Sequence, residues 1–119
     1  MPSTITYRRG QVVIVNIPFT GQGGVKSRPA LVLSATTFHR GLPDLIVCPI
    51  SSQPRFFSNP GTGDHPLQYW KSIGLLYPST ARLSNLMAVE KRIVKRVLGM
   101  ARAADLAQIE RGLREVFDL

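Results

Sequence analysis

Hydrophobic residues in the first half of the chain form three short runs, at residues 12–19, 30–35 and 44–50. Each run is rich in Val, Ile and Leu and is bounded by glycine, proline or polar residues, a pattern typical of β-strands. The breaker-rich segment 39–43 predicts a turn. Short connections favour an antiparallel meander, because parallel neighbours need long crossovers.

The second half alternates between breakers and shorter apolar stretches. Residues 55–66 contain two prolines and two glycines and predict a long loop. After it we expect an edge strand at Leu67 and Tyr69, a helical turn from Trp70 to Gly74, a strand over 79–89 with a bulge near Asn85, and a last strand over 93–100.

The C-terminal segment Ala103–Phe117 has the periodicity of an amphipathic helix. Its apolar residues recur at spacings of three and four and form one stripe: Leu106, Ile109, Leu113, Val116 and Phe117. Asp105 lies in the first turn, where a carboxylate suits the helix dipole. We expect this stripe to pack on the sheet, which makes the fold mainly β with a C-terminal helix.

Composition narrows the class of protein. The 119 residues correspond to a single domain, 1–119, and 44% hydrophobic residues with 18% charged ones are typical of a globular chain. Fifteen Lys and Arg against seven Asp and Glu give a formal charge of +8, which attracts polyanions or an acidic protein. Several of the basic residues cluster between positions 90 and 102: Lys91, Arg92, Lys95, Arg96 and Arg102.

Cysteine and histidine usage argues against disulfide and metal chemistry. Cys48 is the only cysteine and lies inside an apolar run, so we expect a buried, inert thiol. His39 and His65 are far apart in sequence and belong to no zinc-binding spacing. The N-terminus lacks the apolar core of a signal peptide and no run has membrane-spanning length, so we expect a cytoplasmic protein.

A glycine-rich segment joins the first two predicted strands and ends in Lys26, Ser27 and Arg28. Glycine permits positive φ angles and close approach of a ligand to the backbone. Pro29 biases Arg28 toward an extended conformation, and a planar guanidinium held there suits bidentate binding of a phosphate. An ordinary surface arginine in a hairpin loop fits these residues as well.

Ser51, Ser52 and Gln53 directly follow the third predicted strand, which Pro54 prevents from continuing. Arg55 then precedes the aromatic pair Phe56 and Phe57. Such a pair can stack on nucleic-acid bases. A hydrophobic plug against the core and a subunit contact are equally good interpretations.

Several of these segments, in this order, resemble the MazF/PemK family of toxin–antitoxin toxins. They are Pro18-Phe19-Thr20, the run from Lys26 to Ser34 with its Arg-Pro pair, Val47 to Gln53 with Pro-Ile-Ser-Ser, Arg82-Leu83, Val89-Glu90-Lys91 and Leu98-Gly99. The resemblance implies an SH3-like antiparallel barrel and a homodimer. It also implies metal-independent, sequence-specific cleavage of single-stranded RNA, and neutralisation by an acidic antitoxin.

The resemblance also implies roles for particular residues. Arg28 and Ser51 take the catalytic positions, where a guanidinium and a hydroxyl stabilise charge as the ribose 2′-OH attacks the adjacent phosphorus. The expected RNA-binding residues are Lys26, Ser27, Ser52, Gln53, Arg55, Phe56 and Arg82. No metal or other cofactor is implied.

The chain departs from the family pattern at three positions. Ser51 replaces the usual threonine and so loses a methyl that restrains the rotamer. Ser84 and Asn85 stand where the family often has an acidic residue and a lysine or glutamine. No residue is an evident general base; His39 and His65, both in expected loops, are the candidates.

Two other functions remain open from the sequence. One is a non-hydrolytic toxin of the same fold that blocks a protein target such as gyrase; relatives of that kind depend on C-terminal residues, here 116–119. The other is an RNA-binding domain that has lost cleavage. Fold alone does not decide between them.

Overall fold

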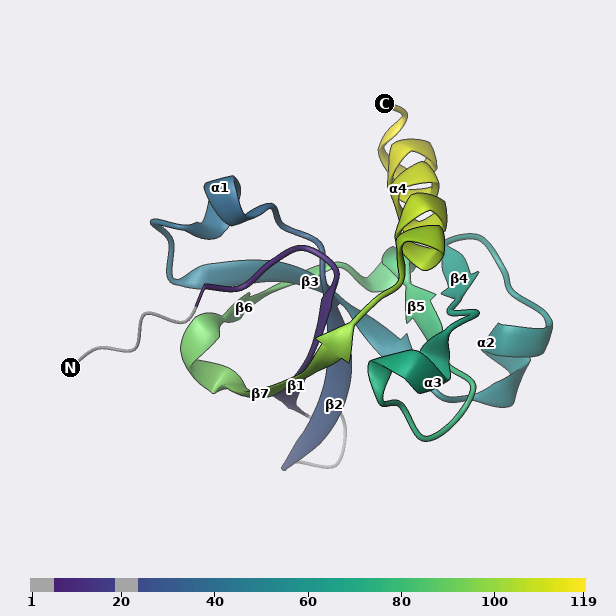
Figure 1. The fold of residues 1–119 in the computed structure, drawn as a ribbon, viewed down its shortest axis with the longest axis horizontal. Coiled ribbons are helices and arrows are strands. Elements are labelled where there is room, and N and C mark those ends of the chain that lie inside the picture. Colours follow the sequence, from purple (N-terminus) through teal and green to yellow (C-terminus); the bar gives the residue numbers. More distant parts are fainter. Residues whose placement is uncertain (1–5, 19–23) are drawn as a thin grey trace.

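The structure, a computed structural model, describes residues 6–18 and 24–119. Short helices separate most of the strands, and a longer helix ends the chain (Figure 1). The elements are β1 Gln11–Pro18, β2 Val25–Val32, α1 Thr36–His39, β3 Asp44–Ser51, α2 Pro54–Ser58, β4 Asp64–Pro66, α3 Trp70–Ile73, β5 Thr80–Arg82, the 3₁₀ turn η1 Leu83–Asn85, β6 Met87–Glu90, the 3₁₀ turn η2 Lys91–Ile93, β7 Val94–Met100 and α4 Ala103–Phe117.

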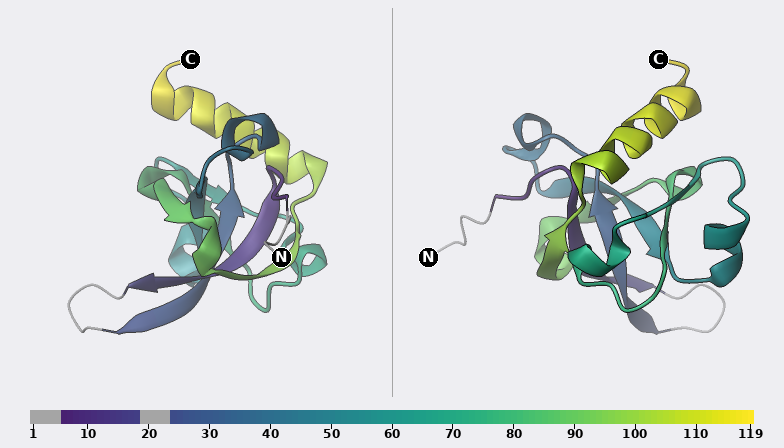
Figure 2. Two further views of the ribbon diagram at one scale, coloured as in Figure 1. Left: turned by 90° about the vertical axis from the view of Figure 1, so that its left-hand side faces the viewer. Right: turned by 45° about the vertical axis from the view of Figure 1, so that its right-hand side comes forward.

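The strands form one antiparallel seven-stranded sheet with the order β4-β5-β3-β2-β1-β7, and β6 pairs with β3 off this path. The first half of β3 pairs with β6, while its last two residues pair with β5. β1 and β2 extend together as a hairpin arm beyond the rest of the sheet (Figure 2). The predicted meander and the mainly β fold with a C-terminal helix are confirmed. Among the described residues the ladder does not close, so the barrel is an open one.

Both faces of the central strands are buried, which explains their nearly continuous apolar runs. Val12 and Leu31 belong to one hydrophobic cluster, and Val13 and Ala30 belong to a second. Successive residues of a strand point to opposite faces, so one strand contributes to both clusters. Cys48 lies in the first cluster, where burial raises the pKa of its thiol to about 12. The prediction of a buried thiol is confirmed.

Two predicted features around β2 are wrong. The strand begins at Val25 and ends at Val32 instead of spanning 30–35, and α1 follows it where we expected polar residues and a turn. Lys26 to Arg28 therefore belong to a strand, because their pairing with β1 continues past Pro29. Pro29 is tolerated because β3 pairs with β2 only from Ala30 onward. Gly24 has the expected positive φ, 97°, while Gly21 and Gly23 lie outside the described residues.

The second half is more helical than predicted. The expected loop 55–66 contains α2 and β4, and Pro54 occupies the first turn of α2, where its missing N–H costs nothing. The edge strand expected at Leu67 and Tyr69 is wrong, because the strand ends at Pro66. The helical turn before Gly74 and the last strand are confirmed. The irregularity expected near Asn85 is the 3₁₀ turn η1.

Helix α4 has the predicted bounds, and most of its stripe packs as expected. Ile109 is buried in the first cluster, with Leu106 and Leu113 packed against it. The last turn differs: Val116 is 43% exposed and Phe117 is 55% exposed. The helix extends beyond the sheet at this end (Figure 1), so its final apolar residues have no sheet below them.

Candidate functional site

The β2–β3 pairing brings Arg28 and Ser51 to one place. Ala30 and Pro49 are the last pair of the β2–β3 ladder, and Arg28 and Ser51 lie two residues beyond them on their strands. Residues two apart on a strand project from the same face, so Arg28 and Ser51 project from the face of that last pair. Both line a hollow of about 310 Å³, which we call the Arg28–Ser51 hollow. Its other lining residues are Pro49, Ile50, Gln53, Arg55, Phe56, Arg82, Asn85 and Met87.

The Ser51 hydroxyl is oriented by the backbone. The Gln53 N–H donates to Ser51 Oγ over 3.2 Å. The oxygen accepts this bond, so the hydroxyl hydrogen can be donated to a ligand. The bond restrains a serine rotamer that lacks the methyl group of threonine.

Arg82 is held in the same hollow by an acidic and an aromatic neighbour. Its Nε lies 2.8 Å from Asp64 Oδ1, and the Asp64 side chain is only 4% exposed. The other carboxylate oxygen accepts from Gly61 N at 3.0 Å. The guanidinium carbon lies 3.7 Å from the Phe56 ring centroid, within cation–π range. Arg82 is therefore a fixed, planar cation.

Phe56 also contacts Arg55, whose guanidinium carbon is 4.7 Å from the ring centroid. The described part of the hollow is thus lined by Arg28, Arg55 and Arg82 together with hydroxyl, amide and apolar groups, and by no carboxylate. Such a lining favours an anion that also presents flat, apolar surface.

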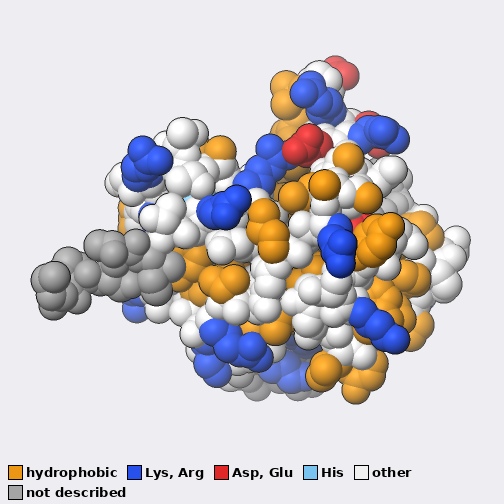
Figure 3. Space-filling view, viewed as in Figure 1, with side chains coloured by type: hydrophobic (Ala, Val, Ile, Leu, Met, Phe, Trp, Pro, Cys, Tyr) orange, Lys and Arg blue, Asp and Glu red, His pale blue; other side chains and the backbone are white. Residues whose placement is uncertain are grey.

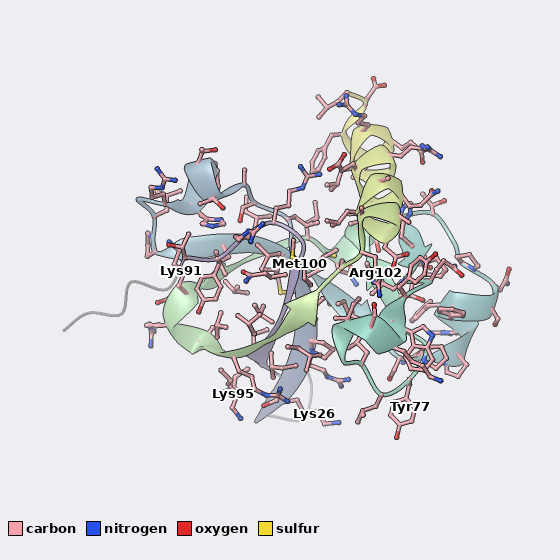
Figure 4. All side chains as sticks on the ribbon, viewed as in Figure 1. Lys26, Tyr77, Lys91, Lys95, Met100 and Arg102 are labelled. Carbon is pink, nitrogen blue, oxygen red and sulfur yellow. The ribbon has the colours of Figure 1, made fainter. Side chains whose placement is uncertain are left out.

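Lys26 and Ser27 lie on opposite faces of β2. Lys26 is two residues from Arg28 and shares its face. Ser27 does not line the hollow: its hydroxyl donates to Asn16 Oδ1 at 2.9 Å and accepts from Lys95 Nζ at 3.2 Å. Lys26 and Lys95 both lie at the lower edge of the molecule in Figure 4. Lys95 was not expected to be a site residue, although it belongs to the basic cluster between positions 90 and 102.

Ser52 does not line the Arg28–Ser51 hollow but lines a second hollow of about 240 Å³. Arg28 lines both hollows. The second hollow is also lined by Tyr77 and Arg96, neither of which was expected to be a site residue. We call it the Tyr77 hollow. Figure 3 shows Lys and Arg side chains beside hydrophobic ones along the lower edge of the molecule.

The structure places neither histidine in these hollows. His39 is 1% exposed, with Nε2 at 2.7 Å from the Tyr7 carbonyl oxygen and Nδ1 at 2.8 Å from Ser34 Oγ. His65 lies on β4, where burial lowers its pKa more than the Glu115 and Asp64 carboxylates raise it. His39 is thus a buried structural residue, and His65 lies outside the lining of both hollows.

The departures at positions 84 and 85 have different structural settings. Asn85 lines the Arg28–Ser51 hollow, whereas Ser84 is exposed on η1 and is not among its lining residues. The acidic partner of Arg82 comes from Asp64 on β4.

The described part of the chain contains neither a cluster of metal ligands nor a membrane-spanning helix. No group of three or more His, Cys, Asp and Glu side chains there is placed to hold a metal ion. No helix within residues 6–18 and 24–119 is long and apolar enough to cross a membrane.

Comparison with known proteins gives a family match. The family described as the PemK-like, MazF-like toxin of type II toxin–antitoxin systems matches residues 8–117. No curated protein matches the chain.

Solved structures share the fold at low sequence identity. A MazE–MazF complex from Deinococcus radiodurans is 22% identical, with a TM-score of 0.73 and coverage of 97% of this chain and 99% of that one. An endoribonuclease in complex with its cognate antitoxin from a Mycobacterial species is 18% identical, with a TM-score of 0.70 and coverage of 96% and 95%. The Mycobacterium tuberculosis toxin MazF-mt6 is 20% identical, with a TM-score of 0.69 and coverage of 90% and 97%.

Proposed function

Since the chain belongs to the PemK-like, MazF-like toxins of type II toxin–antitoxin systems, we propose that it is an endoribonuclease that cleaves single-stranded RNA. Cleavage occurs at a short sequence and needs no metal ion. The observation that carries this proposal is the convergence of Arg28 and Ser51, from two strands, on one hollow lined by further arginines.

The proposed reaction is attack of a ribose 2′-OH on the adjacent phosphorus. The new P–O bond forms as the bond to the 5′-oxygen of the next nucleotide breaks, which leaves a 2′,3′-cyclic phosphate and a 5′-hydroxyl. Negative charge grows on the non-bridging oxygens, where fixed donors contribute most to catalysis. Arg28 neutralises this charge and the Ser51 hydroxyl donates to one of these oxygens.

The surrounding residues hold the RNA strand. Lys26, Arg55 and Arg82 attract its phosphates, and Phe56 with Arg82 offers a flat surface beside the reacting group. Gln53 and Ser52 donate hydrogen bonds at the strand end. Ser27 contributes through Lys95, to which it is hydrogen-bonded.

An acidic antitoxin covers the same basic surface in the inactive complex, and the toxin acts in the cytoplasm as a homodimer. The formal charge of +8 supports a polyanionic or acidic partner. The relatives solved as complexes with antitoxins support this partner for the chain.

The test is digestion of a long single-stranded RNA by the purified protein in EDTA, with sequencing of the ends. We expect cuts at a short motif with 2′,3′-cyclic phosphate ends, and a rate about 100- to 1,000-fold lower for Arg28→Ala. Arg40→Ala is the matched control, because Arg40 is exposed and does not line either hollow. Intact RNA with the unmodified protein, or full activity of Arg28→Ala, would contradict the proposal.

A second candidate function, blockade of a protein target, is supported by the exposed end of α4. Leu119 is 83% exposed beside Val116 and Phe117. If this function were the correct one, deleting residues 116–119 would abolish growth inhibition although the residues that line both hollows remain intact. Circular dichroism of the shortened chain must first match that of the complete one.

A further inference from the structure

The Tyr77 hollow shares Arg28 with the Arg28–Ser51 hollow but is not lined by Arg55 or Arg82. Strands β1, β2, β3 and β7 and the segment after α3 form it. Its lining residues are Ile14, Arg28, Pro29, Ile50, Ser52, Gly74, Leu75, Leu76, Tyr77, Ser79, Arg96 and Leu98. Its volume, about 240 Å³, is below the roughly 300 to 1,000 Å³ of sites for drug-sized ligands. That size suits one flat group better than a stretch of polymer.

The lining combines an apolar floor with positive charge. Ile14, Ile50 and Leu98 supply hydrophobic side chains, while Arg28 and Arg96 supply the charges. No acidic residue is among the described lining residues. A nucleotide fits this combination, because its base is flat and mostly apolar and its phosphate is anionic.

The rim of the hollow is held in place before any ligand binds. Gly74 ends α3 with a φ of 106°, its N–H bonds to Lys71 O at 3.1 Å, and Leu75 N bonds to Trp70 O at 3.3 Å. At the other end of the rim, Ser79 Oγ donates to Tyr77 O at 2.7 Å. Between these anchors Tyr77 remains 63% exposed. An exposed ring on a fixed backbone loses little entropy when a base stacks on it.

The position of Arg28 links this hollow to the proposed cleavage site. Arg28 lines both hollows, so a phosphate bound to it has a base-sized cavity next to it. Figure 4 shows Tyr77 at the same lower edge of the molecule as Lys26, which lies two residues from Arg28.

From these observations, and resting on the proposed ribonuclease function, we propose that the Tyr77 hollow binds the nucleobase adjacent to the phosphate held by Arg28. Tyr77 stacks on the base, the Ser52 hydroxyl bonds to its edge, and Arg96 attracts the phosphate on its far side. This base would be one of those that define the cleavage sequence.

The test uses RNA analogues that cannot be cleaved. A random pool of short oligonucleotides carries 2′-fluoro in place of every 2′-OH and contains 4-thiouridine and 6-thioguanosine. The purified protein is irradiated with this pool, and the crosslinked peptides are mapped by mass spectrometry. We expect crosslinks in the peptide that contains Tyr77.

Two variants make the test specific. Tyr77→Ala should lose these crosslinks and bind the pool about 5- to 100-fold more weakly, as expected when one base loses an aromatic platform. An abasic oligonucleotide has no base to stack on the ring, so Tyr77→Ala and the unmodified protein should bind it with equal affinity. Tyr69→Ala is the control, since Tyr69 is 48% exposed and does not line the hollow. Its binding should stay within about twofold of that of the unmodified protein.

The outcomes separate this inference from the proposed function. Crosslinks confined to the peptide of Arg55 and Phe56, or unchanged binding by Tyr77→Ala, would overturn the nucleobase site even if RNA is cleaved. Unchanged crosslinking of the Tyr77→Ala variant at this peptide would overturn it too, because the ring would then make no contact with the base. Failure of the proposed function appears separately, as intact RNA in the EDTA digest.

Discussion

Arg28 and Ser51 lie just beyond the end of the β2–β3 ladder, on strands that each contain a proline near that end, Pro29 and Pro49. Pro29 and Pro49 have no N–H to donate, and β2–β3 pairing ends at Ala30 and Pro49. Beyond that point the two backbones have no ladder bonds to each other, and the side chains of Arg28 and Ser51 line the hollow there. The segments Arg28-Pro29 and Pro49-Ile50-Ser51 thus mark the place where pairing between the two strands ends beside the hollow.

At the scale of single residues, Ser51 gives the sharpest test of catalysis. Ser51→Ala removes one donor aimed at the reacting phosphate and should lower the RNA cleavage rate about 100- to 1,000-fold. Ser51→Thr keeps the hydroxyl and should retain a rate within about tenfold of that of the unmodified protein. Equal cleavage by Ser51→Ala, measured on a labelled oligonucleotide containing the cut site, would remove Ser51 from the mechanism.

At the scale of elements, α3 and β7 approach so closely at Gly99 that any residue with a Cβ atom at this position would clash. A Cβ at Gly99 would lie 2.1 Å from the Ile73 carbonyl oxygen, which belongs to the backbone and cannot rotate away. Glycine at position 99 therefore lets α3, which precedes the segment 74–79, pack directly against β7. The buried carboxylate of Asp105 binds the backbone just before α3, since it accepts from Gln68 N at 2.9 Å and Tyr69 N at 3.0 Å.

Gly99→Ala should therefore destabilise the protein by about 1–3 kcal/mol, the usual cost of an overpacked contact. Gly41→Ala is the matched control, because a Cβ there meets nothing within 4 Å. Urea unfolding followed by fluorescence measures both. Equal midpoints for the two variants would show that α3 can shift away from β7 at no cost.

At the scale of the whole molecule, His65 couples stability to pH because it lies on β4 with its side chain against α4. A Cβ at Gly112 on the helix would be only 2.2 Å from His65 Nε2. Burial lowers the His65 pKa below its ordinary value of 6.5, while Glu115 on α4 and Asp64 on β4 act in the opposite direction. As pH falls below about 6.5, the unfolded chain binds a proton before the folded chain does.

The contribution of His65 to stability is therefore complete above about pH 6.5 and declines as pH falls toward the lowered folded-state pKa. His65→Gln should lose less stability than the unmodified protein between about pH 7.5 and pH 5. Glu115→Gln should lose more, since it removes a carboxylate that favours the charged imidazole. Urea unfolding at both pH values gives the comparison, and identical pH dependence in all three proteins would exclude His65 as its source.

The local pattern of apolar and polar residues was sufficient to predict those elements in which residues at a regular spacing meet the same surface. The stripe of Leu106, Ile109 and Leu113 defined α4 because every third or fourth residue meets the same surface. It did not show that Phe117 is exposed, because the length of the sheet beneath a helix depends on other segments. The start of β2 at Val25 was missed for a similar reason: pairing with β1 outweighs the local preference of Lys26 to Pro29.

The sequence by itself determined the mainly β fold, the terminal helix, the positive charge and the family resemblance, since these follow from composition and from residue types at short spacings. The tertiary structure decided which side chains share a surface. It brought Arg28 and Ser51 to one hollow, gave Arg82 its acidic partner Asp64, and placed Tyr77 and Arg96 in a second hollow with Arg28. Which of these residues come together depends on strand pairing between segments that are remote in the sequence, and no local pattern encodes that pairing.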